Sequence, residues 1–324
     1  MINRNTQLIE TVETAEIIVP SGARVATWNH VGTPIIKGSS NIKEALVEAG
    51  LDYKVVKRPD YTRHNGRYEK RPGYFWTMKK GSDVYYSHVT ASYEIVQNMD
   101  AFDFLSYFDG ELTIERAGET ADGMVFVIGS LPSVKILGDE FTPYLIFING
   151  FGRYSLRACI CSLRIVCENQ IALSLAKSKS SITMMHTKNV HKKIQEAGIL
   201  TQAGYDYMRE LSAEAERYAL VKINARQLAQ MTEALIPVKN TTEAGIARVM
   251  KKRQEFSEVF ADCYNAEDNQ NFRGSAWGVI NALSDFYTRN PGSKNPEIGF
   301  KNATFTTGEN RLLTAVKILN DIVR

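Results

Sequence analysis

Two kinds of hydrophobic pattern divide the chain. Between residues 74 and 166, short apolar stretches are separated by clusters of turn-forming residues, which is typical of antiparallel strands. The clearest stretches are YFWTM, VYYSHV, LTIERAG, GMVFVIG, TPYLIFING and YSLRACICSLRIV. After Ile171, apolar residues instead recur every three or four positions, which predicts helices around residues 208–223, 246–263, 277–287 and 312–323.

These patterns predict an α+β fold. Residues 1–170 are expected to form an antiparallel sheet with packed helices and a basic, aromatic loop. Residues 171–324 are expected to form a mainly helical region that packs on or beside that sheet. Because Pro59, Asn65-Gly66 and Pro72-Gly73 are turn signals, most of residues 58–73 is predicted to be loop or the tip of a hairpin.

The composition is that of a folded globular protein, with 324 residues, of which 44% are hydrophobic and 23% charged. No run approaches the roughly 20 apolar residues of a membrane span, and the first residues lack the apolar core of a secretory signal. We therefore expect a cytoplasmic protein with no membrane partner. Three of the four cysteines crowd at Cys159, Cys161 and Cys167, which favours buried, reduced thiols over a disulfide framework.

Charge is segregated along the chain. Residues 53–80 hold nine Lys or Arg against two acids, a net +7, whereas the whole chain sums to +3. Six aromatic rings are interleaved with these cations. Sites for single-stranded nucleic acid use this mixture, with cations along the phosphates and rings beneath the bases. The candidate contact residues in this segment are Arg63, Arg67, Tyr68, Lys70, Arg71, Trp76, Lys79 and Lys80, of which Tyr68 and Trp76 are the candidates for stacking.

A second basic segment covers residues 177–193, with five lysines and no acid. Lys188, Lys192 and Lys193 are its candidate contact residues, and the preceding strands add Arg153, Arg157 and Arg164 as a second row. We expect both segments to line one trough for an unpaired strand. The competing interpretation is an edge hairpin whose cations only keep the sheet from pairing with other chains.

Motifs for other chemistry are absent or weak. The chain has no GxxxxGK[ST] loop and no GxGxxG after a strand, so it lacks the signatures of nucleotide hydrolysis and dinucleotide binding. His186 and His191 lie among lysines, which disfavours a metal, and we expect no metal and no cofactor. One alternative is a metal-dependent nuclease. Such an enzyme needs two carboxylates that converge on a cation. Its candidate pairs are Asp60 with Glu69, or two of Asp100, Asp103 and Asp109.

Several segments together resemble the phage/plasmid-like proteins that carry domain of unknown function 932. They are WNHVGTP (28–34), EALVEAGLDYKV (44–55), YEIVQNMDAFDF (93–104), RIVCENQIAL (164–173), MHTKN (185–189) and GSAWGVINALSDF (274–286). The turn at Asn149–Arg153 departs from the family's usual pattern. The resemblance implies a mobile-element protein of a bacterial cytoplasm, and a sheet with a basic groove is similar to the single-strand annealing recombinases.

The leading hypothesis is therefore a protein that binds single-stranded DNA and anneals strands or mediates recombination without ATP. It would act by positioning strands rather than by bond chemistry, as a homo-oligomer whose neighbouring subunits share a groove. Besides the nuclease, the second alternative is a protein-binding module that inhibits a host defence system, with its basic surface turned toward an acidic partner.

Overall fold

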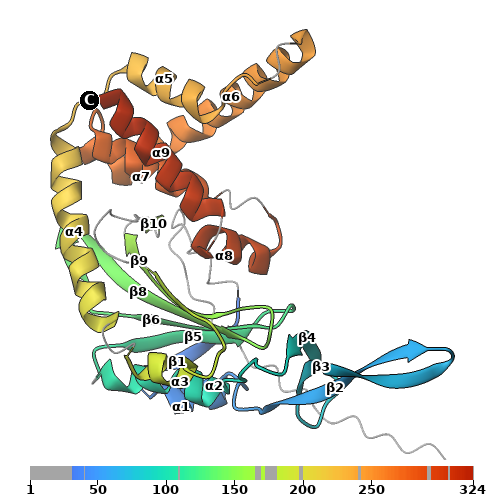
Figure 1. The fold of residues 1–324 in the computed structure, drawn as a ribbon. Coiled ribbons are helices and arrows are strands. Elements are labelled where there is room, and N and C mark those ends of the chain that lie inside the picture. Colours follow the sequence, from blue (N-terminus) through green and yellow to red (C-terminus); the bar gives the residue numbers. More distant parts are fainter. Residues whose placement is uncertain are drawn as a thin grey trace, which may run out of the picture.

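The computed structural model describes residues 31–39, 41–108, 110–164, 169–171, 181–196, 200–239, 242–289, 293–305 and 307–323. An eight-stranded antiparallel sheet forms the centre of the described part (Figure 1). Its main path runs β1 (Thr33–Ser39), β5 (Thr113–Glu119), β6 (Met124–Ser130), β8 (Asp139–Gly150), β9 (Leu156–Arg164) and β10 (Asn169–Ile171). Two short strands lie off this path: β7 (Val134–Ile136) pairs with β8, and β11 (Ser181–Met184) pairs with β9.

Alternation along the central strands creates a core on each face of this sheet. In β8, Leu145 and Phe147 belong to the larger core, whereas Tyr144, Ile146 and Ile148 belong to the smaller one. Successive side chains of a strand point to opposite faces, so a strand that is apolar throughout must be covered on both. Helices provide that cover on both faces.

Short helices from the first half of the chain lie on one face of the sheet (Figure 1). They are α1 (Ile42–Glu48), α2 (Asn98–Ala101) and a 3-10 helix (Asp103–Phe108), joined by α3 (Val190–Glu196) from later in the sequence. Asn41 caps α1 by accepting hydrogen bonds from the amides of Lys43 and Glu44. The sheet and its first layer are therefore built almost entirely from the first 196 residues.

Longer helices make up the C-terminal half. They are α4 (Leu200–Leu220), α5 (Ala225–Leu235), α6 (Glu243–Tyr264), a 3-10 helix (Glu267–Phe272), α7 (Ala276–Arg289), α8 (Pro296–Phe305) and α9 (Thr307–Val323). The larger core continues from the sheet into these helices through fully buried Tyr207 and Trp277. Phe300 of α8 instead completes the smaller core, where its ring lies 5.2 Å from that of Phe126. None of the helices in the described ranges is both long and apolar enough to cross a membrane.

A separate three-stranded sheet carries the basic segment. It contains β2 (Val55–His64), β3 (Arg67–Lys79) and β4 (Tyr85–Thr90) in that order. The β8–β9 loop packs against it, because the Thr77 hydroxyl donates a hydrogen bond to the carbonyl of Phe151. Gly152 makes this approach possible: at its φ of +117°, a Cβ would lie 2.7 Å from Val89. This contact fixes the small sheet to the large one.

The predicted α+β class is confirmed, as is the concentration of helices in the C-terminal part. The prediction of loop or hairpin tip for most of residues 58–73 is confirmed for the hairpin, whose tip is the turn at Asn65-Gly66, whereas both flanks of that turn are strands and not loop. Pro59 lies in β2, which is an edge strand, and an edge tolerates a residue without a backbone donor. The sheet also continues beyond residue 170 through β11, whose four residues were too short a stretch for a pattern to show.

Candidate nucleic-acid interface

The β2–β3 hairpin projects from the body of the protein as an arm (Figure 1). Its strands are joined by Asn65 and Gly66, with φ values of 48° and 79°, and such a two-residue turn matches the twist of the flanking strands. Strand β4 pairs with β3 only between Tyr74 and Met78, so the outer part of the hairpin is two-stranded. Every residue from Tyr61 to Tyr74 is exposed. We call residues 61–74 the arm.

Strand register sorts the arm's side chains onto two faces. Tyr61 lies opposite Lys70, and Arg63 lies opposite Tyr68. Because cross-strand partners share a face and alternate residues do too, these four side chains lie on one face. The rings of Tyr61 and Tyr68 are 56% and 75% exposed. This tyrosine face, made of Tyr61, Arg63, Tyr68 and Lys70, therefore alternates ring and cation both along and across the strands.

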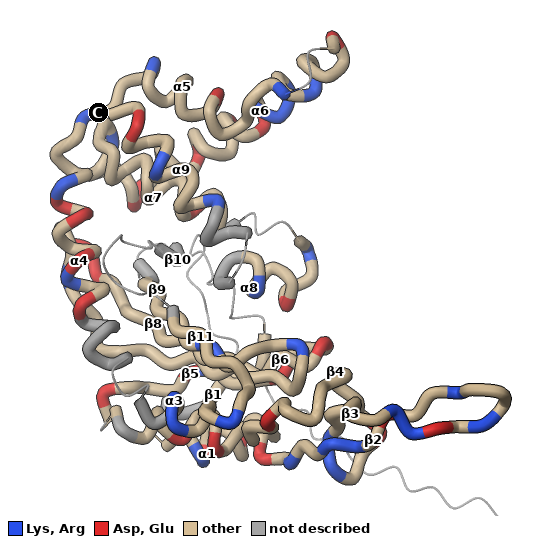
Figure 2. Tube along the Cα trace, viewed as in Figure 1, with Lys and Arg blue, Asp and Glu red and all other residues tan. Residues whose placement is uncertain are grey.

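The opposite face of the arm has a different character. It carries Thr62 opposite Glu69 and His64 opposite Arg67. Among these four residues, the only aromatic group is the imidazole of His64, and the negative charge of Glu69 offsets the positive charge of Arg67. Figure 2 shows the Lys and Arg positions distributed along the whole arm. The charge is thus shared between the faces, whereas the tyrosines are confined to one.

Asp60 anchors the base of the arm. It lies at a register shift between Pro59 and Tyr61 and is only 5% exposed. Its carboxylate accepts hydrogen bonds from Arg71 at 3.0 Å and from the indole of Trp76 at 3.1 Å, and His88 lies 3.4 Å away. Removal from water raises the pKa of Asp60, but the charges and hydrogen bonds of His88 and Arg71 outweigh it and hold the pKa below its usual value.

Several predicted contact residues are committed to this base or lie away from the arm. Trp76 is half-buried, and its ring centroid lies 3.7 Å from that of His88. Arg71 pairs with Asp60 and also lies over the Tyr74 ring at 4.5 Å. Lys79 lies over the ring of Tyr53 at 3.9 Å, and Lys80 is exposed in the β3–β4 turn. The free cations of the arm are Arg63, Arg67 and Lys70, which form no ion pair with any residue in the described ranges.

The predicted second row is not continuous with the arm. Arg153 lies in the loop that packs on β4, and its guanidinium is 3.9 Å from the carboxylate of Asp122. Arg157 is half-buried in β9, between β8 and β11. Arg164 ends β9, where it pairs with Phe141 and Asn169, and its side chain lies outside the described part. None of these three positions extends the tyrosine face.

The segment around α3 approaches the small sheet at one point. Lys188 lines a cavity of about 330 Å³ together with Thr90, which ends β4, and with Ser92 and Tyr93, which follow it. His186 stacks on Tyr93 there with ring centroids 4.9 Å apart, and burial lowers the pKa of this histidine. Lys192 and Lys193 are exposed on α3, and Figure 2 shows that helix well separated from the arm. Lys188 is therefore the one predicted lysine of this segment that reaches the base of the small sheet.

The described carboxylates of the nuclease alternative either have a cationic partner, as Asp60 and Asp103 do, or are exposed, as Glu69 and Asp100 are. Asp60 is occupied by Arg71, whereas Glu69 lies exposed on the arm. Asp103 pairs with Lys43 at 3.1 Å, and Asp109 lies outside the described residues. Over the described ranges, no three His, Cys, Asp or Glu side chains gather in a group that could hold a metal ion. The nuclease alternative gains no support from this geometry.

Tyr61 is the arm residue that the sequence reasoning left out. Its signal was present, because an Asn-Gly turn at 65–66 fixes which residues of the two flanking strands lie opposite each other. Counting outward from that turn places Tyr61 and Tyr68 on the same face. The prediction of loop or hairpin tip for residues 58–73 gave no strand bounds from which to make this count.

Fold and arm together define an α+β protein with an exposed ribbon of cations and rings. Residues 85–313 match the family model described as "Domain of unknown function (DUF932)", and since this is more than half of the chain, the protein belongs to that family. The resemblance proposed from the sequence is thereby confirmed. The arm precedes the matched residues. Comparisons with curated proteins and with solved structures found no match.

Proposed function

We propose that this protein binds single-stranded nucleic acid, DNA in the first instance, along the tyrosine face of the arm. The observation that carries the proposal is the register, which places two exposed tyrosines and two free cations on one face. Bases stack on aromatic side chains for about 1–3 kcal/mol each, whatever their sequence, while cations neutralise the adjoining phosphates. A flexible single strand can follow a ribbon of this kind, whereas a duplex hides its base faces.

The proposed role is strand annealing or recombination mediation without ATP, in the cytoplasm of a bacterium that hosts a mobile element. Arg63 and Lys70 bind phosphates beside the rings of Tyr61 and Tyr68, on which the bases stack. Arg67, directly after the Asn65-Gly66 turn, binds a further phosphate where the strand leaves the tyrosine face at the tip of the arm. One arm spans only a few nucleotides, because β3 begins at Arg67 and is already paired with β4 from Tyr74 onward. Annealing therefore requires several arms in a row, which implies a homo-oligomer in which neighbouring copies extend one binding track.

The test is equilibrium binding of a fluorescent oligothymidylate to the full chain and to ring variants. Tyr68→Leu removes the ring but keeps an apolar side chain, and should weaken binding by about 1–3 kcal/mol, or roughly 5- to 150-fold. Tyr68→Phe keeps the ring and should bind nearly as the parent does. Tyr61→Leu should behave as Tyr68→Leu does.

A matched control uses the opposite face of the arm. Thr62→Leu places the same leucine on the face without tyrosines, and should leave oligonucleotide affinity unchanged. Equal affinity for Tyr68→Leu and Tyr68→Phe would remove stacking from the proposal. Undetectable binding of the unchanged protein at about 50 mM salt, where phosphate contacts are strong, would end it.

A further inference from the structure

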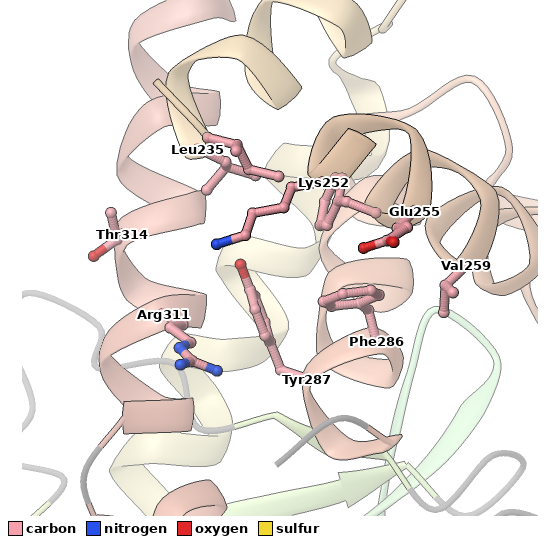
Figure 3. Close-up of a pocket in the computed structure, with 10 residues that line it drawn as sticks. Leu235, Lys252, Glu255, Val259, Phe286, Tyr287, Arg311 and Thr314 are labelled. Atoms are coloured by element: carbon pink, nitrogen blue, oxygen red, sulfur yellow. The ribbon is translucent and has the colours of Figure 1, made fainter. Parts of the chain in front are cut away.

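A second cavity lies among the C-terminal helices, outside the arm and its sheet. It has a volume of about 730 Å³ and is formed by α5, α6, α7 and α9 (Figure 3). Ligand pockets typically span about 300–1,000 Å³. The lining residues come from four helices that are far apart in the sequence, so no local motif marks the site.

The wall of this cavity is apolar. Phe256 and Phe286 meet edge to face with ring centroids 4.8 Å apart, and Leu235, Ile236 and Val259 complete the wall. Val259 is 37% exposed, although it lines the same cavity as Phe256 and Phe286. Apolar groups left open to water in a concave surface gain free energy when a ligand covers them. The wall therefore favours an apolar body.

One side of the cavity is polar and positive. Figure 3 shows the Lys252 amine and the Tyr287 hydroxyl pointing toward each other, with the Arg311 guanidinium on the same side. Within the described residues, neither Lys252 nor Arg311 forms an ion pair. Burial raises the pKa of Tyr287 against the opposing charge of Arg311, so the hydroxyl remains a proton donor near neutral pH.

We propose that this cavity binds a small amphipathic anion, with an apolar chain or ring system against Phe256 and Phe286. Its carboxylate or phosphate head accepts hydrogen bonds from Lys252, Arg311 and Tyr287. Charge-assisted hydrogen bonds of this kind are about twice as strong as neutral ones, and a guanidinium can hold either head group in a bidentate manner. Glu255 points to the other side of the cavity and disfavours an anion there (Figure 3).

Two dyes with the same rings test the need for a negative charge. The aromatic anion 8-anilinonaphthalene-1-sulfonate carries a sulfonate, whereas N-phenyl-1-naphthylamine lacks it. Fluorescence titration of the full chain should show one saturable site for the anion and at least about tenfold weaker binding of the neutral dye. Equal binding of the two dyes would overturn the proposal. Competition with decanoate and with decyl phosphate then distinguishes a carboxylate from a phosphate ligand.

Charge-neutral variants locate the site. Lys252→Gln and Arg311→Gln should each weaken binding of the anionic dye by about tenfold or more. Arg248→Gln on α6 and Lys317→Gln on α9 remove the same charge from the same helices outside the cavity, and should leave binding unchanged. All four side chains are exposed, so the variants should keep the parent's melting temperature.

Two outcomes separate this site from the arm. Both cavity variants should bind an oligonucleotide as the parent does, because no arm residue lines the cavity. Displacement of the dye by the oligonucleotide, but by neither decanoate nor decyl phosphate, would overturn the assignment of a small ligand. Loss of dye binding in the two control variants would do so as well, because it would show that general charge attracts the dye.

Discussion

The number of free cations on the arm predicts how strongly salt weakens oligonucleotide binding. Each phosphate neutralised on a single strand contributes about −0.7 to the slope of log K against log salt concentration. Arg63, Arg67 and Lys70 are free, whereas Arg71 is held by Asp60. Three contacts give a slope of about −2.1, so raising salt from about 50 to about 200 mM should weaken binding about 20-fold.

Two substitutions should move this slope in opposite directions. Arg63→Gln leaves two phosphate contacts, so the slope should fall to about −1.4 and the loss over the same salt range to about 7-fold. Asp60→Asn releases Arg71 from its ion pair, so Arg71 can bind a fourth phosphate. The slope should then be about −2.8, and the affinity should fall about 50-fold over the same salt range. Removing one acid from the base of the arm should thus steepen the salt dependence by the contribution of one phosphate contact, about −0.7.

The assay is a fluorescence anisotropy titration at four salt concentrations and about pH 8, where ordinary histidines are neutral. Asp83→Asn is the control, since it removes an exposed acid from the turn at the far end of β3 without releasing a cation. Its slope should equal that of the parent. An Arg63→Gln slope equal to the parent's, or an Asp60→Asn slope equal to that of Asp83→Asn, would refute the counting of phosphates on this arm.

Three further predictions concern stability. Partial burial raises the pKa of Asp122, but hydrogen bonds, first that from Lys301, lower it to about 2. Below about pH 4 the unfolded chain therefore binds more protons than the folded chain, so stability falls as the pH is lowered. The free energy of unfolding, measured with urea, should fall by about 1 kcal/mol from pH 4 to pH 2. This figure is reduced for solvent screening, because the Asp122 side chain is 33% exposed. A rise over that range would contradict the sign. Phe300→Ala opens a cavity in the smaller core and should cost about 3–5 kcal/mol in the same measurement, whereas a loss below about 1 kcal/mol would mean that α8 is not docked. Replacing residues 61–70 with Asn-Gly, so that Asp60 and Arg71 flank a two-residue turn, should abolish oligonucleotide binding. The free energy of unfolding should change by less than about 1 kcal/mol, because the removed residues are all exposed. Persistent binding would place the site elsewhere.

Local signals in the sequence were sufficient for most of the fold. Residues 80–83 and 119–122 each join two paired strands, and the sequence marks both junctions because turn residues and alternation act over a few positions. Thr242 caps α6 by accepting a hydrogen bond from the amide of Gly245, and threonine is a residue type that favours this position. The prolines of the basic segment lie within the strands of the hairpin, since a proline interrupts a central strand but is tolerated at an edge.

Tertiary contacts account for what the sequence could not show. Asp60 was a candidate metal ligand because of its neighbours in the chain, but its role follows from Arg71, Trp76 and His88, which only strand pairing brings to it. The cavity beside Lys252 is a stronger case, because its lining residues come from four helices and run from Leu235 to Thr314. Ion pairs and pockets of this kind depend on packing, which periodicity does not encode.

The distribution of tyrosines separates the two explanations of the basic arm. An exposed two-stranded ribbon risks pairing with other chains, and cations on both faces are sufficient to oppose that pairing. Edge protection does not call for exposed rings, and it gives no reason for Tyr61 and Tyr68 to share one face while Glu69 lies on the other. Exposed rings favour association when nothing covers them, so they add to the very risk that the cations reduce.

A surface that alternates ring and cation on one face is what a single strand requires, because its bases and phosphates also alternate along one side. The arrangement of the arm therefore favours a binding role, which Tyr68→Leu and Thr62→Leu test on its two faces.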